Sequence, residues 1–280
     1  MLTPFLLGVS LLVILPLLAT VGLAFSEFDA LSPPTWKGLG NFSEIFQRDL
    51  FWIAARNSLL FVLLAVPLRV GGALLLALFF NHRRRAVALY RSAVYLPTII
   101  PDVAYALIWL WIFNPIFGPL NLALQWFGIE GPAWLGQKET ALLAIVLMSL
   151  FQIGEGFLVL LSGLQDAPPE YYHAAQVDGA TRWQMFRWIT LPLLGPWLLL
   201  LTIRDILWST QSTFAPAYLM TGGRPHYATL FMPLLIFEEA FDRFRFGQGS
   251  AMMLVMLAAI GLLLYGVYRL VGGWGYQDDV

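Results

Sequence analysis

Long segments without a charged residue recur along the chain. A helix needs roughly 20 consecutive apolar residues to cross the hydrocarbon core of a bilayer. Two segments, 57–80 and 140–165, contain one charged residue each, Arg69 and Glu155, and still have the character of membrane helices with one polar guest. Four uninterrupted segments are close to that length or longer: 1–26, 103–129, 206–223 and 246–268.

These segments predict an all-α, polytopic membrane protein in which residues 1–280 form a single transmembrane domain with about six spanning helices. The first apolar segment lacks a positively charged start, is long for a signal peptide and has a weak cleavage pattern, so we expect it to be retained as a span. The expected helices are 3–25, 58–80, 93–113, 141–163, 193–214 and 248–270, and the long connections are 26–57, 114–140 and 215–247.

The connection between the second and third expected helices contains a dense group of arginines. Arg83, Arg84, Arg85 and Arg91 fall within about a dozen residues, and short loops weigh most in the positive-inside rule. The total numbers of lysines and arginines on the two sides of the membrane are equal, so the density of these residues in the short loop decides the orientation. We therefore expect this loop, and with it both chain termini, to face the cytoplasm from a cell (inner) membrane.

The composition agrees and removes several classes of function. Hydrophobic residues make up 59% of the chain and charged residues 12%, whereas a soluble domain has about 25% charged residues. The net charge of -1 leaves no broad basic face for a nucleic acid. There is no cysteine, and His82, His173 and His226 are scattered over loops, so we expect no metal site, no cofactor and no catalytic residues.

A polar segment, 164–192, separates the fourth and fifth expected helices. Pro168 and Pro169 end the fourth helix, because proline lacks the N–H and clashes with the preceding turn, and a short helix is expected at 169–177. Gly179 can adopt a positive φ and turn the chain into an amphipathic helix that leads back to the membrane. From these residues alone, the hairpin is equally a docking element for another protein or a structural loop.

Four short motifs in this hairpin closely resemble the EAA loop of binding-protein-dependent ABC importers: Pro168, His173-Ala174-Ala175, Asp178-Gly179-Ala180 and Ile189-Thr190-Leu191-Pro192. In that family the loop forms a coupling helix, which enters a cleft of the ATPase subunit and passes its closure to the membrane helices. His173 stands where the family usually has glutamate, which removes an acidic contact. The resemblance implies a cytoplasmic coupling loop at 164–192 whose coupling residues are Glu170, Tyr172, His173, Ala174, Ala175, Asp178, Gly179 and Ala180.

The resemblance extends over nearly the whole chain and narrows to the MalF-type carbohydrate permeases. Tyr95-Leu96-Pro97, Gly118-Pro119-Leu120-Asn121 and Tyr218-Leu219-Met220-Thr221-Gly222-Gly223 carry it. It implies the type I ABC importer permease fold and a sugar or oligosaccharide substrate. The implied partners are a second, MalG-type permease, two copies of an ABC ATPase subunit and an extracytoplasmic solute-binding protein.

The chain contains no GxxxxGK[ST] phosphate-binding loop, so ATP hydrolysis is expected on a separate subunit and the chain itself is not expected to be an enzyme. Two alternatives stay open at this point. One is a permease for glycerol phosphate or another polar solute. The other, from a different class, is a stand-alone secondary transporter, which would need no cytoplasmic docking hairpin.

Polar residues inside the spans are candidates for the substrate path, because such residues are costly in lipid and usually face a bundle interior or water. Amides and hydroxyls bind sugar hydroxyls, and an aromatic ring stacks on the apolar face of a pyranose. Hydrogen bonding between helices is an equally open interpretation. The candidates for substrate binding are Gln152, Glu155, Trp208, Ser209, Thr210, Gln211 and Thr213, and the resemblance places parts of the fourth and fifth helices along the sugar site.

Three other charged residues in the spans have a different expected role. Arg204 and Asp205 diverge by about 100 degrees on a helix, so we expect each to pair with another helix. Arg69 could pair with Glu155 or with Asp205, and the sequence leaves that choice open. We interpret these residues as structural or gating elements that do not bind substrate.

Overall fold

The computed structural model describes residues 2–81 and 87–271, and most of these residues are helical. Within these residues, three helices are each long and apolar enough to cross a membrane, and there are up to six spans if each of three bent helix pairs counts as one. This agrees with the six spans expected from the sequence. Arg83, Arg84 and Arg85 lie outside the described residues.

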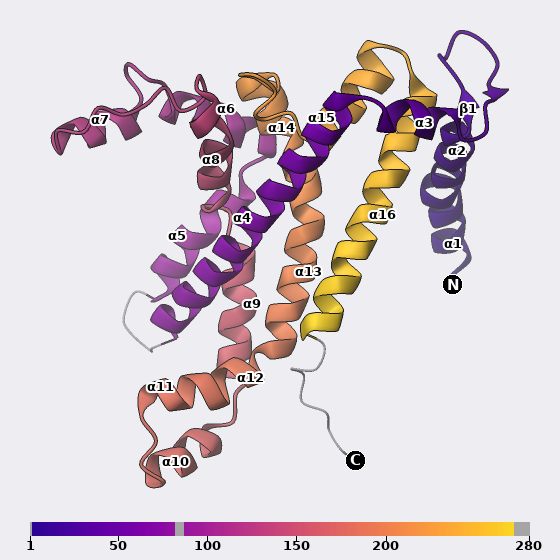
Figure 1. Ribbon diagram of the computed structural model, residues 1–280. Coiled ribbons are helices and arrows are strands. Elements are labelled where there is room, and N and C mark those ends of the chain that lie inside the picture. Colours follow the sequence, from indigo (N-terminus) through magenta and orange to yellow (C-terminus); the bar gives the residue numbers. More distant parts are fainter. Residues whose placement is uncertain (1, 82–86, 272–280) are drawn as a thin grey trace.

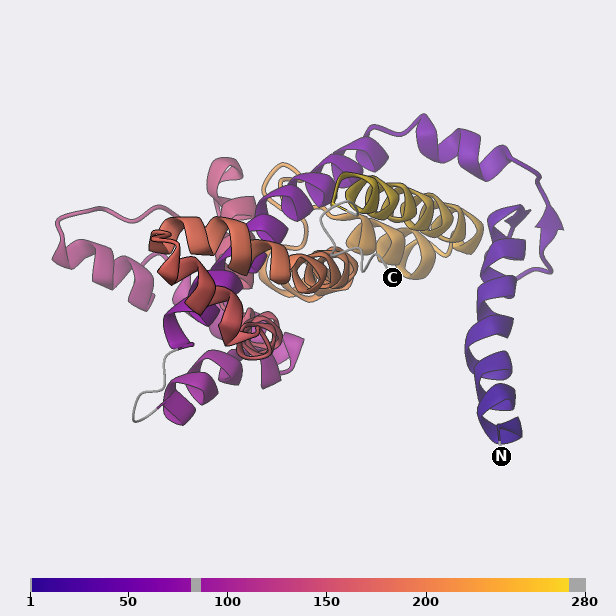
Figure 2. The same ribbon diagram turned by 90° about the horizontal axis from the view of Figure 1, so that it is seen from below.

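The first span, Thr3–Ala24, lies at the edge of the molecule (Figure 2). It consists of α1 (Thr3–Val9), the π-helical turn η1 (Ser10–Ile14) and α2 (Leu15–Ala24). Ala24 is its one buried residue, and α2 contacts the last span, α16 (Phe246–Val271). This helix therefore presents nearly all of its apolar surface outward, as a lipid-facing helix does.

The second span begins earlier than the sequence suggested. An antiparallel pair of short strands, β1 (Ser26–Glu27) and β2 (Thr35–Trp36), is followed by α3 (Gly40–Phe46), and then α4 runs from Asp49 to Phe80. The expected start was residue 58, because Asp49 and Arg56 interrupt the apolar pattern. Both side chains are exposed, so the helix continues beyond its apolar part without burying either charge.

The third expected helix, 93–113, is instead two helices. They are α5 (Val87–Ile99) and α6 (Asp102–Ile112), and their axes differ by 101°. The break falls at Pro101, which has an extended ψ of 140°, because the residues around a proline disfavour continued helix. A short surface helix, α7 (Pro119–Trp126), follows at the same end of the molecule as α3 (Figure 1).

The fourth expected helix, 141–163, is also bent, by 47°, between α8 (Lys138–Ser149) and α9 (Gly154–Gln165). Gly154 opens α9 directly against α5: a Cβ atom there would lie 2.7 Å from the Cα of Tyr95. A side chain at this position would therefore push the two helices apart.

The remaining elements form the hairpin, the fifth span and the segment before α16. The segment Arg182–Leu193 of the hairpin and the segment Gly195–Thr221, which contains α13, form a pair bent by 62°. At the centre of the molecule α4 packs against α9 and α13, and the small residues Ala73 and Ala77 of α4 lie in that core (Figure 1). The elements from the hairpin to the segment before α16 are α10 (Pro169–Val177), α11 (Arg182–Met185), η2 (Phe186–Thr190), α12 (Leu191–Leu193), α13 (Gly195–Ser212), α14 (Phe214–Pro216), η3 (Ala217–Thr221), α15 (Met232–Phe237) and η4 (Glu238–Asp242).

Candidate functional site

The hairpin of α10 and α11 projects from one end of the helical bundle (Figure 1). Helix α10 covers Pro169–Val177, the range expected from the sequence. Gly179 has a φ of +77°. Its N–H donates to the carbonyl of Gln176 at 3.1 Å, and the N–H of Ala180 donates to the carbonyl of Ala175 at 2.8 Å. This pair of bonds is the Schellman arrangement, which satisfies the last carbonyls of α10 and turns the chain sharply.

The second arm of the hairpin starts with a capping box. The Thr181 N–H donates to Oε1 of Gln184 at 2.7 Å, and the Gln184 N–H donates to Oγ1 of Thr181 at 3.3 Å. Our sequence interpretation missed this cap, although its Thr-x-x-Gln spacing is a known signal. Tyr172 on α10 is hydrogen-bonded to Thr190 on η2, Oη to Oγ1, at 3.1 Å. The turn is thus defined at both ends and closed by a bond between its arms.

The outer surface of the hairpin is unusually apolar for a segment outside the bundle. No residue of α10 is buried, and Val177, Trp183 and Trp188 are largely exposed. A hollow of about 300 Å³ lies between the arms, lined by residues that include Ala175 and Ala180. Exposed apolar side chains of this kind can meet either a partner protein or the membrane interface. Of the predicted coupling residues, Glu170, His173, Ala174, Asp178 and Gly179 are exposed, and Tyr172, Ala175 and Ala180 are half-buried.

Within the spans, charged residues of α4, α9 and α13 gather in one place. Nε of Arg69 lies 2.9 Å from Oδ2 of Asp205, and both side chains are buried. Arg69 also donates to Ser209 Oγ, and its guanidinium carbon lies 4.6 Å from the ring centre of Trp208. The alternative left open by the sequence is thereby resolved in favour of Asp205.

Glu155 pairs with Arg204, which joins α9 to α13. The expectation that Arg204 and Asp205 pair with other helices is confirmed. The side chains of Glu155 and Arg204 are 47% and 39% exposed. Charged groups at this depth normally face water or other protein, so this face of α9 and α13 is a candidate lining for a polar path. Gln152 borders a small cavity of about 20 Å³ beside Arg69, Arg204 and Asp205, which is room for about one water molecule.

The predicted substrate residues therefore fall into separate environments. Gln152, Glu155 and Trp208 lie around the charged cluster, and Ser209 is buried within it, donating to the Asp205 carbonyl at 2.7 Å. Thr210 and Thr213 line an apolar hollow of about 150 Å³ between α4, α13, α15 and α16, which Ser209 also borders, and Gln211 is exposed. The sequence could not separate these environments because each depends on which neighbouring helix faces a given side of α9 or α13.

Comparison with known proteins identifies the family. The family of binding-protein-dependent transport system inner membrane components matches residues 69–273. The chain belongs to this family. Among its relatives, the probable ABC transporter permease protein YesP of Bacillus subtilis (strain 168) is 36% identical over 99% of this chain and 91% of its own length. The trehalose/maltose transport system permease protein MalF of Thermococcus litoralis is 31% identical over 93% and 88% of the two chains.

The fold of this permease also matches a solved importer. The structure of a bacterial ABC transporter involved in the import of the acidic polysaccharide alginate has a chain that superposes with a TM-score of 0.84 at 24% identity, covering 97% of this chain and 93% of that one. The predicted ABC importer permease fold and family are thus confirmed. The alternative of a stand-alone secondary transporter is set aside.

Proposed function

We propose that this permease forms, with a second permease subunit, the path through which an ABC importer carries a sugar or oligosaccharide. An extracytoplasmic solute-binding protein delivers the substrate, and two copies of a separate ATPase subunit supply the energy. The observation that carries this proposal is the hairpin at 164–192, which is ordered by its own caps and exposes apolar side chains away from the bundle.

The surface of the hairpin supports its proposed coupling role. Small residues at Ala174 and Ala175 allow close approach of a partner, and Val177 adds an exposed apolar contact. The hairpin and the C-terminal end of α16 lie at one end of the molecule, and the N-terminal end of α1 points the same way (Figure 1). This arrangement supports a cytoplasmic location for both termini.

A sugar is favoured over glycerol phosphate by the charges in the spans. Relatives with either substrate occur: the trehalose/maltose permease MalF of Thermococcus litoralis and the sn-glycerol-3-phosphate permease UgpA of Agrobacterium fabrum are 31% and 27% identical to this chain. Here the Arg69 and Arg204 guanidiniums are each paired with a carboxylate, of Asp205 and Glu155. Among the described residues of that cluster no cation is left unpaired to bind a phosphate, whereas Gln152 and Trp208 offer contacts for a neutral sugar.

Affinity purification of the tagged chain from its native membrane, with subunit stoichiometry by mass spectrometry, tests the proposal. We expect one copy of a second permease and two copies of an ATPase subunit. Recovery of the chain alone or as a homo-oligomer, across several detergents, would contradict it. Identification of the companion binding protein then allows its sugar to be determined by direct titration.

A further inference from the structure

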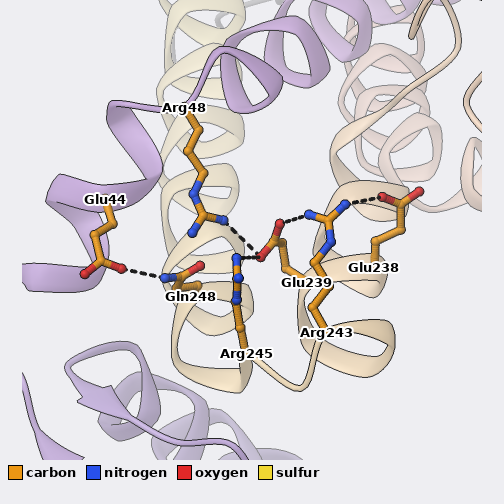
Figure 3. Close-up of polar contacts among 7 residues, drawn as sticks. All are labelled: Glu44, Arg48, Glu238, Glu239, Arg243, Arg245 and Gln248. Carbon is orange, nitrogen blue, oxygen red and sulfur yellow. Dashed lines mark hydrogen bonds and ion pairs between the residues drawn. The ribbon is translucent and has the colours of Figure 1, made fainter.

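The end of the molecule opposite the coupling hairpin contains a polar network centred on Glu239 (Figure 3). Glu239 is 1% exposed. Its Oε2 atom lies 3.0 Å from Nη1 of Arg48 and 3.5 Å from Nη1 of Arg245, and its Oε1 atom accepts a bond from Arg243. One buried carboxylate therefore ties the corner between α3 and α4 to the turn between η4 and α16.

In front of this network lies a hollow of about 500 Å³, bounded by the β1–β2 hairpin, α3 and the start of α16. We call it the outer hollow. Its volume is within the range of roughly 300–1,000 Å³ that is typical of small-molecule sites. The polar residues that line it include Lys37, Asn41, Glu44, Arg48, Arg245 and Gln248.

Most of the charged side chains around the outer hollow already have partners within the protein. Nζ of Lys37 lies 2.7 Å from Oε1 of Glu44, and Arg48 and Arg245 share Glu239. Oδ1 of Asp29 accepts the backbone N–H groups of Leu31 and Ser32 at 3.0 and 2.9 Å. An ionic ligand would have to displace these contacts, whereas a neutral ligand would not.

Hydrogen-bonding capacity nevertheless remains unused. The Gln248 side chain is 9% exposed, and its Nε2 donates to Glu44 at 2.5 Å. Its Oε1 atom is buried and has no hydrogen-bond partner in the part of the chain that the structure describes. A guanidinium has five N–H donors, and Arg48 and Arg245 each direct one nitrogen at Glu239. The outer hollow thus offers both donors and an acceptor, as a ligand rich in hydroxyl groups requires.

Aromatic rings stand beside these polar groups. Phe244 has a φ of +55°, in the left-handed region that a bulky side chain rarely adopts, and its ring is 54% exposed at the hollow. Phe28 also lines the hollow, and its ring centre lies 5.7 Å from that of Phe246. Backbone strain of this kind persists where the surroundings require it and is often found at binding sites.

We infer that the outer hollow is a binding site for a neutral carbohydrate of one or two sugar units, separate from the polar face of α9 and α13. Arg48, Arg245 and Gln248 bind the sugar hydroxyls, and the Phe244 ring packs on the apolar face of the pyranose. The inference rests on the proposed function for its substrate class. The site holds a sugar at the outer ends of α4 and α16, outside the membrane path.

The test uses the assembled complex in nanodiscs without its binding protein, and saturation-transfer NMR with maltose and trehalose as probes and the open-chain polyol sorbitol as a control. We expect a saturable signal from at least one disaccharide. Gln248→Met removes the free acceptor and should weaken binding by at least about tenfold, the effect of one lost polar contact of about 1.4 kcal/mol. Gln125→Met, the same exchange at an exposed position of α7, should leave it unchanged.

Phe244→Gly is the second variant. It removes the ring and also relieves the positive φ, so that it should weaken binding without harming the fold. Gln152→Met reports on the membrane path. Loss of the signal in Gln152→Met but not in the two outer variants would overturn the inference, as would the absence of any signal from both disaccharides.

A third result would also overturn the inference of a sugar site. If Gln248→Met and Phe244→Gly abolish docking of the binding protein while no free sugar binds, the outer hollow is a protein interface. Co-purification of the ATPase and ATP-driven sugar uptake are measured on the same preparations. Failure of these would count against the proposed function, whereas their persistence without sugar binding would count against the outer site alone.

Discussion

The Nε atom of Arg69 on α4 lies 2.9 Å from Oδ2 of Asp205 on α13, and the two residues are 136 positions apart in the sequence. The pair joins the second span to the fifth, and the Trp208 ring lies beside the same guanidinium. A pair buried at this depth matters most when it is half removed, because the remaining charge then has no partner.

Asp205→Ala should therefore destabilise the permease by about 3–5 kcal/mol, whereas the double change Arg69→Met with Asp205→Leu should cost much less. Thermal unfolding of the purified complex measures both. Asp49→Ala, which removes an exposed carboxylate at the start of α4, serves as the control and should have little effect. Equal losses for the single and the double variants would show that the ion pair itself is the main stabilising contribution.

Gly179→Val should abolish sugar uptake while leaving membrane insertion intact, because a β-branched side chain is strongly disfavoured at a φ of +77°. Gly261→Val, at an exposed position of α16 with open space around it, is the matched control. Gly179→Asn should retain part of the activity, since asparagine tolerates this conformation. Normal uptake by the valine variant would remove the hairpin turn from the coupling mechanism.

Gln152→Leu should keep the ATPase bound but change the KM for uptake, because Gln152 borders the cavity beside the charged cluster.

Thr210→Val tests the predicted substrate role of Thr210, whose hydroxyl donates to the Ile206 carbonyl at 3.2 Å and which lines the apolar hollow. Altered uptake would support that role. Unchanged uptake across several substitutions would take the residue out of the substrate site.

The contact between Lys37 and Glu44 should make stability at the outer end of the molecule depend on pH. The hydrogen bond from Lys37 holds the pKa of Glu44 below its ordinary value of 4.5. The stabilisation is therefore present above pH 4.5 and is lost as the pH falls through the lowered pKa. Because the pair is partly exposed, we expect at most about 1 kcal/mol.

Lys37→Met should accordingly lower the Tm of the complex at about pH 6, and this difference should shrink below about pH 4. Lys138→Met, at an exposed position at the start of α8, is the control. A difference that does not change with pH would mean that Lys37 stabilises the fold through the packing of its aliphatic stem.

Features set by neighbouring residues could be predicted from the sequence. The apolar segments gave the spans, and two adjacent prolines and one glycine gave α10 with its bounds at Pro169 and Val177. The motifs in the same hairpin gave the family, which the comparison confirms. In each case the information lies within a few residues of the feature that it determines.

Features set by contacts between residues far apart in the chain could not be predicted from the sequence. The approach of α9 to α5 at Gly154 depends on how two spans pack, so the 47° bend leaves no clear trace in the local sequence. The partner of Arg69 depends on the relative rotation of α4 and α13, and the sequence offered Glu155 and Asp205 equally. The signal from Pro101 was present, but the sequence does not say whether a proline produces a mild kink or the 101° bend observed.

The hairpin is joined to the charged cluster by nearly continuous helix. From Arg182 to Ser212 the helical path is interrupted only by the bend at Leu194, whose side chain is buried and whose N–H still donates to the Thr190 carbonyl at 3.0 Å. The helical segments before and after Leu194 meet at an angle of 62°. No flexible loop therefore separates the hairpin from Arg204 and Asp205 in this described segment.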